Sequence, residues 1–358
     1  MVSKLYSTQF PLSVKDGKPV VRLSASQRKW IDKLNKAIDE GILQLHPNDC
    51  LCGNPHREND IVVAEKDRYG LPISQILCCN CGLIRSGVTF DEESNAEFYK
   101  TYYRPIYSSE KPTDDFFNQQ IKTGHQFIKF IKQNIPFDNI DHLAEIGCGA
   151  GGILMPFKAE GKRVDGYDYG QEYLKYGIAK GLNLHCGGYE QIEDASLDLI
   201  ILSHVMEHFL DPIDEMTQIV KKIKAGKYLL VEVPGVFWIS EGYFNPIWYF
   251  QNAHVFNYYS DYLSVFFKSL GLKVLYGDER CTFICQKPVN WKLDDVKPIV
   301  WDSSLQAHQQ KIISYLVSCD RRYKNRFSNP VWLKHCLWLF ANKVGWQRIR
   351  PYFIKNKS

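Results

Sequence analysis

The sequence predicts an α/β protein built on a largely parallel sheet, and two features of its middle part carry this prediction. Short apolar segments that read as strands alternate with helical patterns, at 142–146, 163–167, 197–202 and 228–233. A glycine-rich turn follows the first of these segments, and an acidic residue, Asp168, ends the second. Such alternation is typical of parallel strands joined by helical crossovers, with helices on both faces of the sheet.

Composition sets broad limits on the function. The chain has 358 residues, of which 45% are hydrophobic and 23% charged, an ordinary globular balance with room for more than one domain. The net charge is only +4, so we expect no nucleic-acid partner, which would usually require a strong basic stripe. The segment after Met1 lacks the apolar stretch of a signal peptide, and no uncharged run is long enough to cross a membrane. We therefore expect a cytoplasmic protein.

The cysteines are unevenly distributed. There are 11, and in a reducing compartment they are expected to be thiols or metal ligands rather than disulfides. Cys50 and Cys52 form one close pair, and Cys78, Cys79 and Cys81 form a second group. Two such groups suit tetrahedral zinc, because each short turn presents two thiolates to one point. We predict a zinc site made by Cys50, Cys52, Cys78 and Cys81, with Cys79 as an alternative to Cys78.

The surroundings of the cysteines support a small zinc-ribbon-like module over residues 49–90. Gly53 follows the first pair and Gly82 the second, where a metal-binding turn commonly needs a positive φ. The segments 61–63 and 73–77, between the pairs, read as strands. The alternative is a set of buried free thiols, since free cysteine is often buried.

The glycine-rich turn marks a ligand site at the carboxyl ends of the strands. It contains Glu145, Gly147, Gly149, Gly151 and Gly152. Glycines let the backbone pass close to a ligand there, and this spacing also satisfies the dinucleotide-binding fingerprint, which is weak alone. Glu145 would repel a pyrophosphate, and the turn has no Lys or Arg before Lys158. The turn therefore favours a ligand that carries a cationic group and no phosphate.

Asp168 lies about 20 residues beyond the glycines, where an acid can accept the hydroxyl groups of a ribose. The alternative is a turn residue ahead of Gly170. An adenine ring would need an apolar wall and an edge contact, for which Tyr169 and Tyr189 are the candidates.

These residues resemble the class I S-adenosylmethionine (SAM)-dependent methyltransferases over residues 120–290. The segment 199–212 is similar to the fourth-strand segment of that family. The resemblance implies a Rossmann-like core with a final antiparallel strand, SAM as the cofactor, and Ser203 and His204 on the methionine side of its pocket. The cysteine groups are similar to the module that precedes some sugar methyltransferases, which extends the resemblance to residues 50–290.

The resemblance also suggests where the acceptor binds. His254 lies in a segment similar to the family's substrate site, and His208 follows the fourth strand, so both are candidates for a general base. The alternative interpretation of His254 is a structural histidine, and the alternative for His208 is a residue that packs against the cofactor. Gln251 and Ala253 stand where the nucleotide-sugar C-methyltransferases have a tyrosine and a glutamate. This departure favours O-methylation of a sugar or saccharide over C-methylation.

The loop over residues 236–260 is rich in aromatic residues that suit the apolar faces of sugars. They are Phe237, Trp238, Tyr243, Phe244, Trp248, Tyr249 and Phe250. We therefore expect a small-molecule or saccharide acceptor in a cleft between this loop and the zinc module. Two further classes stay open: a methyltransferase that recognises protein or RNA through the zinc module, and a non-catalytic dinucleotide-binding protein.

The organisation along the chain follows from these assignments. We expect an N-terminal segment over 1–48 with a helix at 26–42 and Ser26 as its N-cap, because Trp30, Leu34, Ile38 and Ile42 have helical spacing. The zinc module follows over 49–90, and then a linker over 91–140 with a helix capped by Thr113. The SAM-binding core spans 141–290, and a helical extension spans 291–358. From Arg321 onward there are ten Lys and Arg and no acids. A helix after Pro330 would pack on the core, or contact a membrane surface or a lipid-linked saccharide.

Overall fold

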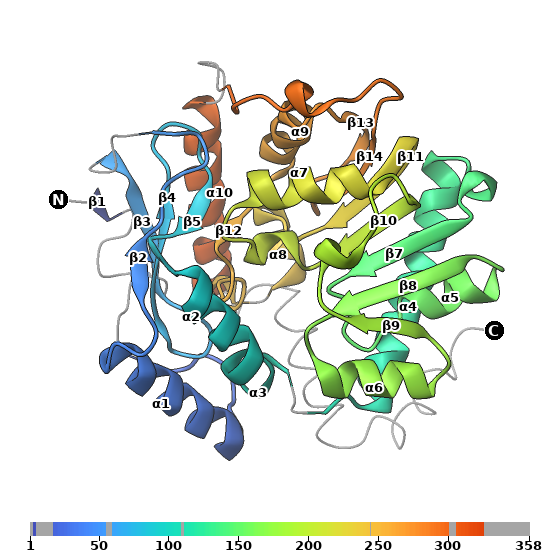
Figure 1. Cartoon of the computed structure of the whole chain (residues 1–358). Helices are drawn as coiled ribbons and strands as arrows, with labels where there is room; N and C mark the ends of the chain where they lie inside the picture. The colour runs from blue at the N-terminus through green and yellow to red at the C-terminus, as the bar shows by residue number, and fades with distance from the viewer. Residues whose placement is uncertain are drawn as a thin grey trace, which may run out of the picture.

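The computed structural model describes residues 3–4, 17–54, 59–108, 111–243, 245–300 and 306–325. These residues form a seven-stranded sheet, a five-stranded sheet and a two-stranded pair. Figure 1 shows the two larger sheets side by side, with helix α10 (Gln306–Lys324) next to the smaller one. Among the described helices, none combines the length and apolar character needed to cross a membrane.

The seven-stranded sheet has the order β13-β14-β11-β10-β7-β8-β9. Its strands are β7 (His142–Ile146), β8 (Arg163–Asp168), β9 (Asn183–Cys186), β10 (Leu197–Ser203), β11 (Ile223–Glu232), β13 (Lys273–Gly277) and β14 (Thr282–Gln286). Neighbouring strands run parallel except that β14 is antiparallel to β11 and to β13. The predicted fold, with its final antiparallel strand, is therefore confirmed. The strand order changes direction between β7 and β10, which places a ligand site at their carboxyl ends.

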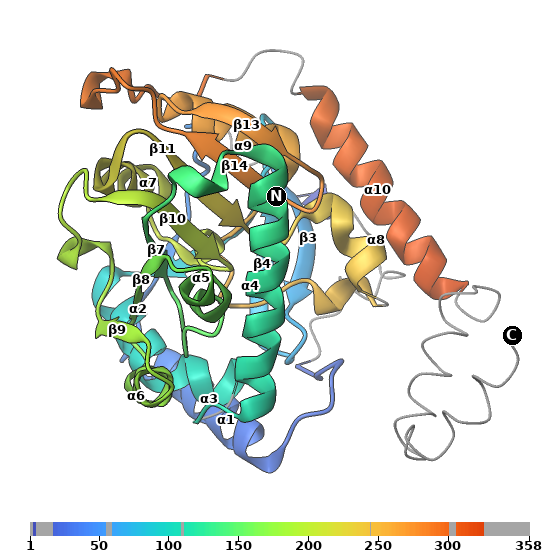
Figure 2. The ribbon, with the colours of Figure 1, turned by 90° about the vertical axis from the view of Figure 1, so that its right-hand side faces the viewer.

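Helices cover both faces of this sheet, as Figure 2 shows. They are α4 (Asp114–Asn134), α5 (Leu154–Ala159), α6 (Gln171–Ala179), α7 (Pro212–Lys222) and α9 (Ser260–Ser269). Leu199 and Ile201 of β10 belong to the core shared with α4, α5 and α6, whereas Ile200 and Leu202 belong to the core shared with α7 and α9. Successive strand residues point to opposite faces, so a strand buried on both faces must be apolar throughout.

The five-stranded sheet contains the cysteine module and has the order β1-β3-β4-β5-β12. Its strands are β1 (Ser3–Lys4), β3 (Ile61–Lys66), β4 (Pro72–Leu77), β5 (Ile84–Ser86) and β12 (Phe256–Asn257). The last strand comes from the loop after β11, and Phe256 pairs with Arg85. The Asn257 side chain also donates a hydrogen bond to Gln75, at 2.7 Å. The module is therefore completed by a strand from a distant part of the chain.

The first helix, α1 (Ala25–Asp39), begins earlier than the sequence predicted. Its N-cap is Ser24, not Ser26, because Ser24 and Gln27 form a reciprocal capping box. The helix ends before Gly41, whose φ of +69° is left-handed, and Ile42 beyond it is 64% exposed. The buried face is therefore made by Ile31, Leu34 and Ala37.

The linker between the two sheets is mostly helical. It contains α2 (Glu92–Glu97), a π-helical turn at Phe98–Tyr103, and α3 (Arg104–Tyr107). Just before it, β6 (Val88–Phe90) pairs with β2 (Leu45–Pro47), which precedes the cysteine module. The predicted cap of the next helix is confirmed, since the Thr113 hydroxyl accepts a hydrogen bond from the Phe116 amide at 3.1 Å. The next helix along the chain is α4.

The last described elements pack on the cysteine module. Ile312 of α10 contacts Gly82, and Leu316 and Cys319 belong to the same core as Cys81. The short helix α8 (Ile239–Gly242) also contacts α10, because the Ser240 amide donates a hydrogen bond to the Tyr315 hydroxyl at 2.9 Å. The helix predicted after Pro330 lies outside the described residues.

Candidate active site

A cavity of about 570 Å³ opens at the carboxyl ends of β7, β8 and β10. Most of the residues predicted to bind the cofactor line it, namely Glu145, Gly147, Gly149, Asp168, Tyr169, Tyr189, Ser203 and His204. They come from four separate segments, which the parallel sheet brings to one edge. This edge includes the point where the strand order changes direction, where open α/β sheets bind their ligands.

The glycine turn wraps over the end of β8. Gly147 and Gly149 have φ values of +74° and +56°, which residues other than glycine adopt at a cost. The amides of Gly147 and Cys148 both donate to the Tyr167 carbonyl, at 2.8 and 3.0 Å. Gly151 serves a different purpose from the one predicted. It does not line the cavity, and a Cβ there would lie 2.9 Å from Leu182, so this glycine permits close packing against β9.

Glu145 carries a buried carboxyl group at the edge of the cavity. The residue is 1% exposed, and its Oε2 has no hydrogen-bond partner among the described residues. Burial, followed by the charge of Asp168, raises the pKa of Glu145 well above its usual range. A buried acceptor without a partner is costly, so a donor group from a ligand would stabilise it.

Asp168 ends β8 and lies at the centre of a hydrogen-bond network. Its Oδ2 accepts from the Gly149 amide at 2.9 Å, and its Oδ1 accepts from the Gly170 amide at 2.6 Å. Arg104 donates to both oxygens at 3.1 Å, and its guanidinium also lies over the Tyr173 ring. The acid predicted to hold a ribose is thus held by an arginine from the linker.

His204 is held between two carboxylates at the end of β10. Its Nδ1 lies 3.5 Å from Glu207 Oε1 and its Nε2 lies 3.6 Å from Glu232 Oε1. Burial alone would lower the pKa of His204, but the two carboxylates outweigh it and raise the pKa to about 10. The φ of His204 is +57°, an uncommon conformation that turns its side chain toward these acids. At this end of the cavity the two carboxylates thus favour the protonated form of His204.

The two candidate bases lie side by side, but only one of them faces the cavity. The ring centroids of His208 and His254 are 5.0 Å apart. His208 lines the cavity, and its Nδ1 donates to the Ala253 carbonyl at 2.8 Å. His254 is 3% exposed and lies behind His208, away from the lining residues. Burial and the neighbouring His208 lower the pKa of His254 to about 3.

The aromatic residues that line the cavity beside His208 are not those that the sequence predicted for the acceptor site. No described aromatic residue of the loop 236–260 lines the cavity, and Tyr249 and Phe250 are fully buried in the core. The physical reason is that β12 fixes the end of this loop to β5, so its rings pack inward. Tyr99 and Tyr103 from the π-helical turn line the cavity instead, and both rings meet His208 edge to face.

Several lining residues were assigned no role from the sequence. They include Arg104, Gln120, Glu215, Glu232 and Arg280. Gln120, for example, holds the glycine turn: its side chain donates to the Cys148 carbonyl at 3.0 Å and accepts from the Gly152 amide at 3.1 Å. The only signal in the sequence was the tyrosine-rich stretch around Arg104, whose spacing places Tyr99 and Tyr103 on one side of a helix.

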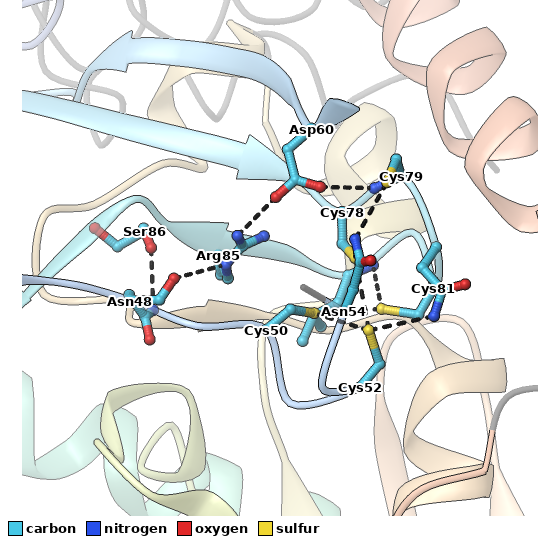
Figure 3. Close-up of polar contacts among 12 residues, drawn as sticks. Asn48, Cys50, Cys52, Asn54, Asp60, Cys78, Cys79, Cys81, Arg85 and Ser86 are labelled. Carbon is cyan, nitrogen blue, oxygen red and sulfur yellow. Dashed lines mark hydrogen bonds and ion pairs between the residues drawn. The ribbon is translucent and has the colours of Figure 1, made fainter. Parts of the chain in front are cut away.

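The four predicted zinc ligands meet in a single cluster, shown in Figure 3. The Sγ atoms of Cys50 and Cys81 are 3.5 Å apart, as are those of Cys50 and Cys52, and Cys52 and Cys78 are 3.7 Å apart. Four thiolates about 2.3 Å from one zinc ion would lie about 3.8 Å apart, so the cluster fits tetrahedral zinc. Gly53 and Gly82 have φ values of +67° and +75°, as the pattern predicted.

Cys79 lies outside this cluster and has other contacts. Its Sγ accepts from the Asn54 side chain at 3.2 Å, and its amide donates to Asp60 Oδ1 at 3.0 Å. Figure 3 shows that Asp60 links this turn to Arg85, at 2.7 Å. Arg85 in turn donates to the Asn48 carbonyl, just before the first cysteine pair. The buried ion pair therefore holds the two cysteine turns in place.

Comparison with known proteins agrees with this geometry. Residues 120–276 match the family described as "Methyltransferase domain". No curated protein was found to match the chain. Among solved structures, a SAM-dependent methyltransferase of Thermotoga maritima shares 16% identity over 49% of this chain and 93% of its own, with a TM-score of 0.38. A SAM-dependent methyltransferase of Archaeoglobus fulgidus shares 20% identity over 55% of this chain and 87% of its own, with a TM-score of 0.37.

The matched segment runs from α4 through β13 and contains the glycine turn, Asp168 and the segment after β10. It therefore includes most of the strands whose carboxyl ends form the cavity. The strand order, with β14 antiparallel, is that of the class I fold. Residues 120–276 thus match a methyltransferase domain, and the sheet that contains them has the topology of the class I SAM-dependent methyltransferase fold.

Proposed function

We propose that this protein transfers a methyl group from SAM to a hydroxyl group of a sugar or saccharide, with His208 as the general base. The observation that carries this proposal is the position of His208. Its Nδ1 donates to a backbone carbonyl, so the neutral ring keeps its Nε2 lone pair free on a side chain that lines the cavity. His254, buried behind it, supports the ring from the other side.

The cofactor supplies an electrophilic methyl group on a sulfonium. Asp168 would accept the ribose hydroxyl groups, and Tyr169 and Tyr189, which line the adjacent wall, would contact the adenine. The buried carboxyl of Glu145 would accept from the ammonium of the methionine part. The negative carboxyls and the absence of a phosphate-binding cation in the glycine turn suit this cationic ligand.

The acceptor's oxygen attacks the methyl carbon as the carbon–sulfur bond breaks, and the hydroxyl proton passes to His208 Nε2. The protein mainly supplies alignment and a proton acceptor in this reaction. Tyr99 and Tyr103 offer aromatic faces beside His208, which suit the apolar face of a sugar ring. Gln251 and Ala253 lack the polar helpers expected for C-methylation, which favours the hydroxyl over carbon.

We also propose that the four clustered cysteines hold a structural zinc ion. The cluster is buried between β4, β5 and the turn before Gly53, and the Tyr259 hydroxyl donates to the Cys81 carbonyl at 2.6 Å. Zinc would thereby fix the turn that anchors β5, β12 and the loop that carries His254. Its role would be in positioning, since the cluster is separate from the residues that line the cavity.

The acceptor class is tested with labelled SAM. Purified full-length protein is incubated with fractionated cell extract, and the labelled product is identified by mass. We expect the label on a sugar or saccharide oxygen. Label on a carbon or nitrogen atom of a sugar would change the reaction type, and label on protein or RNA would reject the acceptor class.

The base is tested with His208→Ala. A positioned base contributes about a hundred- to ten-thousand-fold, so turnover should fall by that order while SAM affinity stays nearly constant. His125→Ala is the matched control, because His125 is an exposed histidine on α4 outside the cavity lining. Full turnover in His208→Ala would reject this residue as the base.

A further inference from the structure

Glu207, His208 and His254 form a compact group of potential metal ligands, of which only His208 lines the cavity. One ligand atom from each residue lies within 4.8 Å of the others. Glu207 Oε1 is 3.9 Å from His208 Nε2 and 4.0 Å from His254 Nε2. The two segments are tied together independently of these side chains, because the Val255 amide donates to the Glu207 carbonyl at 2.9 Å.

The carboxylate of Glu207 lacks the partners that a buried charge requires. The residue is 1% exposed, and neither carboxylate oxygen has a hydrogen-bond partner among the described residues. Its nearest cationic neighbour, His204 Nδ1, is 3.5 Å away from Oε1. A buried carboxylate left without hydrogen bonds is strongly destabilising, and an ion is one of the few groups that resolve this.

We propose that Glu207, His208 and His254 bind a divalent transition-metal ion next to the acceptor. Two imidazoles and one carboxylate are a common ligand set for such ions. Ligand atoms about 2.1 Å from a tetrahedral ion lie about 3.4 Å apart, so the two distances from Glu207 Oε1 need to contract by only about half an ångström.

Two further features fit a catalytic rather than a structural ion. The Nδ1 of His208 donates to the Ala253 carbonyl, the outer contact that metal-binding histidines usually make through their second nitrogen. Three protein ligands leave a coordination position open, and His208 is the ligand that borders the cavity from which an acceptor would approach. The cysteine cluster, in contrast, supplies four ligands and leaves no open position.

The catalytic consequence rests on the proposed function. An ion at this position would bind the acceptor hydroxyl and lower its pKa, so that the O–H proton leaves to water in the cavity and the electron pair stays on the oxygen. His208 Nε2 is then a ligand and not the base, because one lone pair cannot serve both roles. If His208 is a general base, the buried His254 only supports its ring. If both histidines bind the ion, methyl transfer requires His254 as much as His208.

The test is a cobalt titration of metal-depleted, full-length protein. Cobalt in the cysteine cluster gives a thiolate charge-transfer band, whereas cobalt bound by nitrogen and oxygen does not. We expect two cobalt ions per wild-type chain, and one in His208→Ala, in His254→Ala and in the near-isosteric Glu207→Gln. The thiolate band should persist in all three variants, which shows that they are folded. His125→Ala should bind two.

One cobalt ion in the wild type, or two in every variant, would overturn the site. Methyl transfer is then measured with the cysteine cluster loaded and the second site empty, or with both loaded. Transfer that needs the second ion, and is lost equally in His208→Ala and His254→Ala, supports its catalytic role. Transfer that is unchanged without it rejects that role and leaves His208 as the base. If no sugar is labelled in any metal state, the proposed function fails, and the cobalt stoichiometry still decides the site.

Discussion

Arg104 and Asp168 form an ion pair across the cofactor edge, with one guanidinium nitrogen 3.1 Å from each carboxylate oxygen. The arginine begins α3 in the linker, and the aspartate ends β8 in the core. The Gly149 and Gly170 amides donate to the same carboxylate. A carboxylate accepts about four hydrogen bonds, so ribose hydroxyls must replace those from Arg104.

This competition predicts opposite effects for two substitutions. Asp168→Asn should weaken SAM binding about 10- to 100-fold, since it removes charge-assisted hydrogen bonds. Arg104→Met keeps an apolar stem against Tyr173 but frees the carboxylate, and should tighten SAM binding about two- to fivefold. Calorimetry on both variants measures these changes. Weaker binding by Arg104→Met would mean that Arg104 contacts the cofactor itself.

Gly149→Arg should abolish SAM binding while the protein stays folded. The side chain would enter the cavity from the glycine turn, and the φ of +56° adds a backbone cost of about 1–2 kcal/mol. Gly161→Arg is the matched control, because Gly161 also has a positive φ but nothing within 4 Å of its Cβ position. Calorimetry and thermal unfolding compare the two. Normal SAM binding by Gly149→Arg would show that the site is assigned wrongly.

Cys81→Ser should lower the zinc content by one equivalent per chain and destabilise the five-stranded sheet. Cys81 is fully buried in the cluster, whereas Cys79 lies beside it with Asn54 and Asp60 as partners. Cys79→Ser should therefore keep its zinc and most of its stability. Elemental analysis and thermal unfolding measure both properties. Equal zinc contents in the two variants would exclude the four-cysteine site.

Asp198 should make the protein sensitive to acid. Burial alone would raise the pKa of Asp198, but hydrogen bonds from the His142 amide and from Lys224 outweigh it and lower the pKa from 3.8 to about 2. The folded pKa is below the unfolded one, so this stabilisation is present above about pH 4 and lost as the pH falls toward 2. Its size is about 2 kcal/mol.

Asp198→Asn should therefore lower the free energy of unfolding at neutral pH by about 2 kcal/mol and flatten its decline between pH 4 and 2. Denaturant unfolding at several pH values measures both effects. Asp194→Asn should change little, because the Asp194 carboxylate, which pairs with Lys222, is exposed. If the free energy of unfolding of Asp198→Asn declines between pH 4 and 2 as steeply as that of the wild type, Asp198 is not the group that causes the decline.

Local patterns in the sequence were enough to predict the local structure. The apolar run at 142–146 coincides with β7, the acid at position 168 ends β8, and Thr113 caps α4. The spacing of the cysteines also grouped the four that meet in the cluster. Each of these features depends on residues a few positions apart, whose backbone preferences act without help from the rest of the chain.

Contacts between distant segments were decided only by the tertiary structure. Arg104 meets Asp168 across 64 residues, and β12 pairs with β5, which turns the aromatic loop inward and leaves His208 rather than His254 facing the cavity. One local feature was predicted wrongly: the N-cap of α1 is Ser24 and not Ser26, because Gln27, three residues later, completes the capping box of Ser24. The sequence alone determined the class of fold, the glycine turn and the cysteine groups, because short-range patterns encode them. Which side chains reach the reacting atoms depends on how whole elements pack, and no local pattern encodes that.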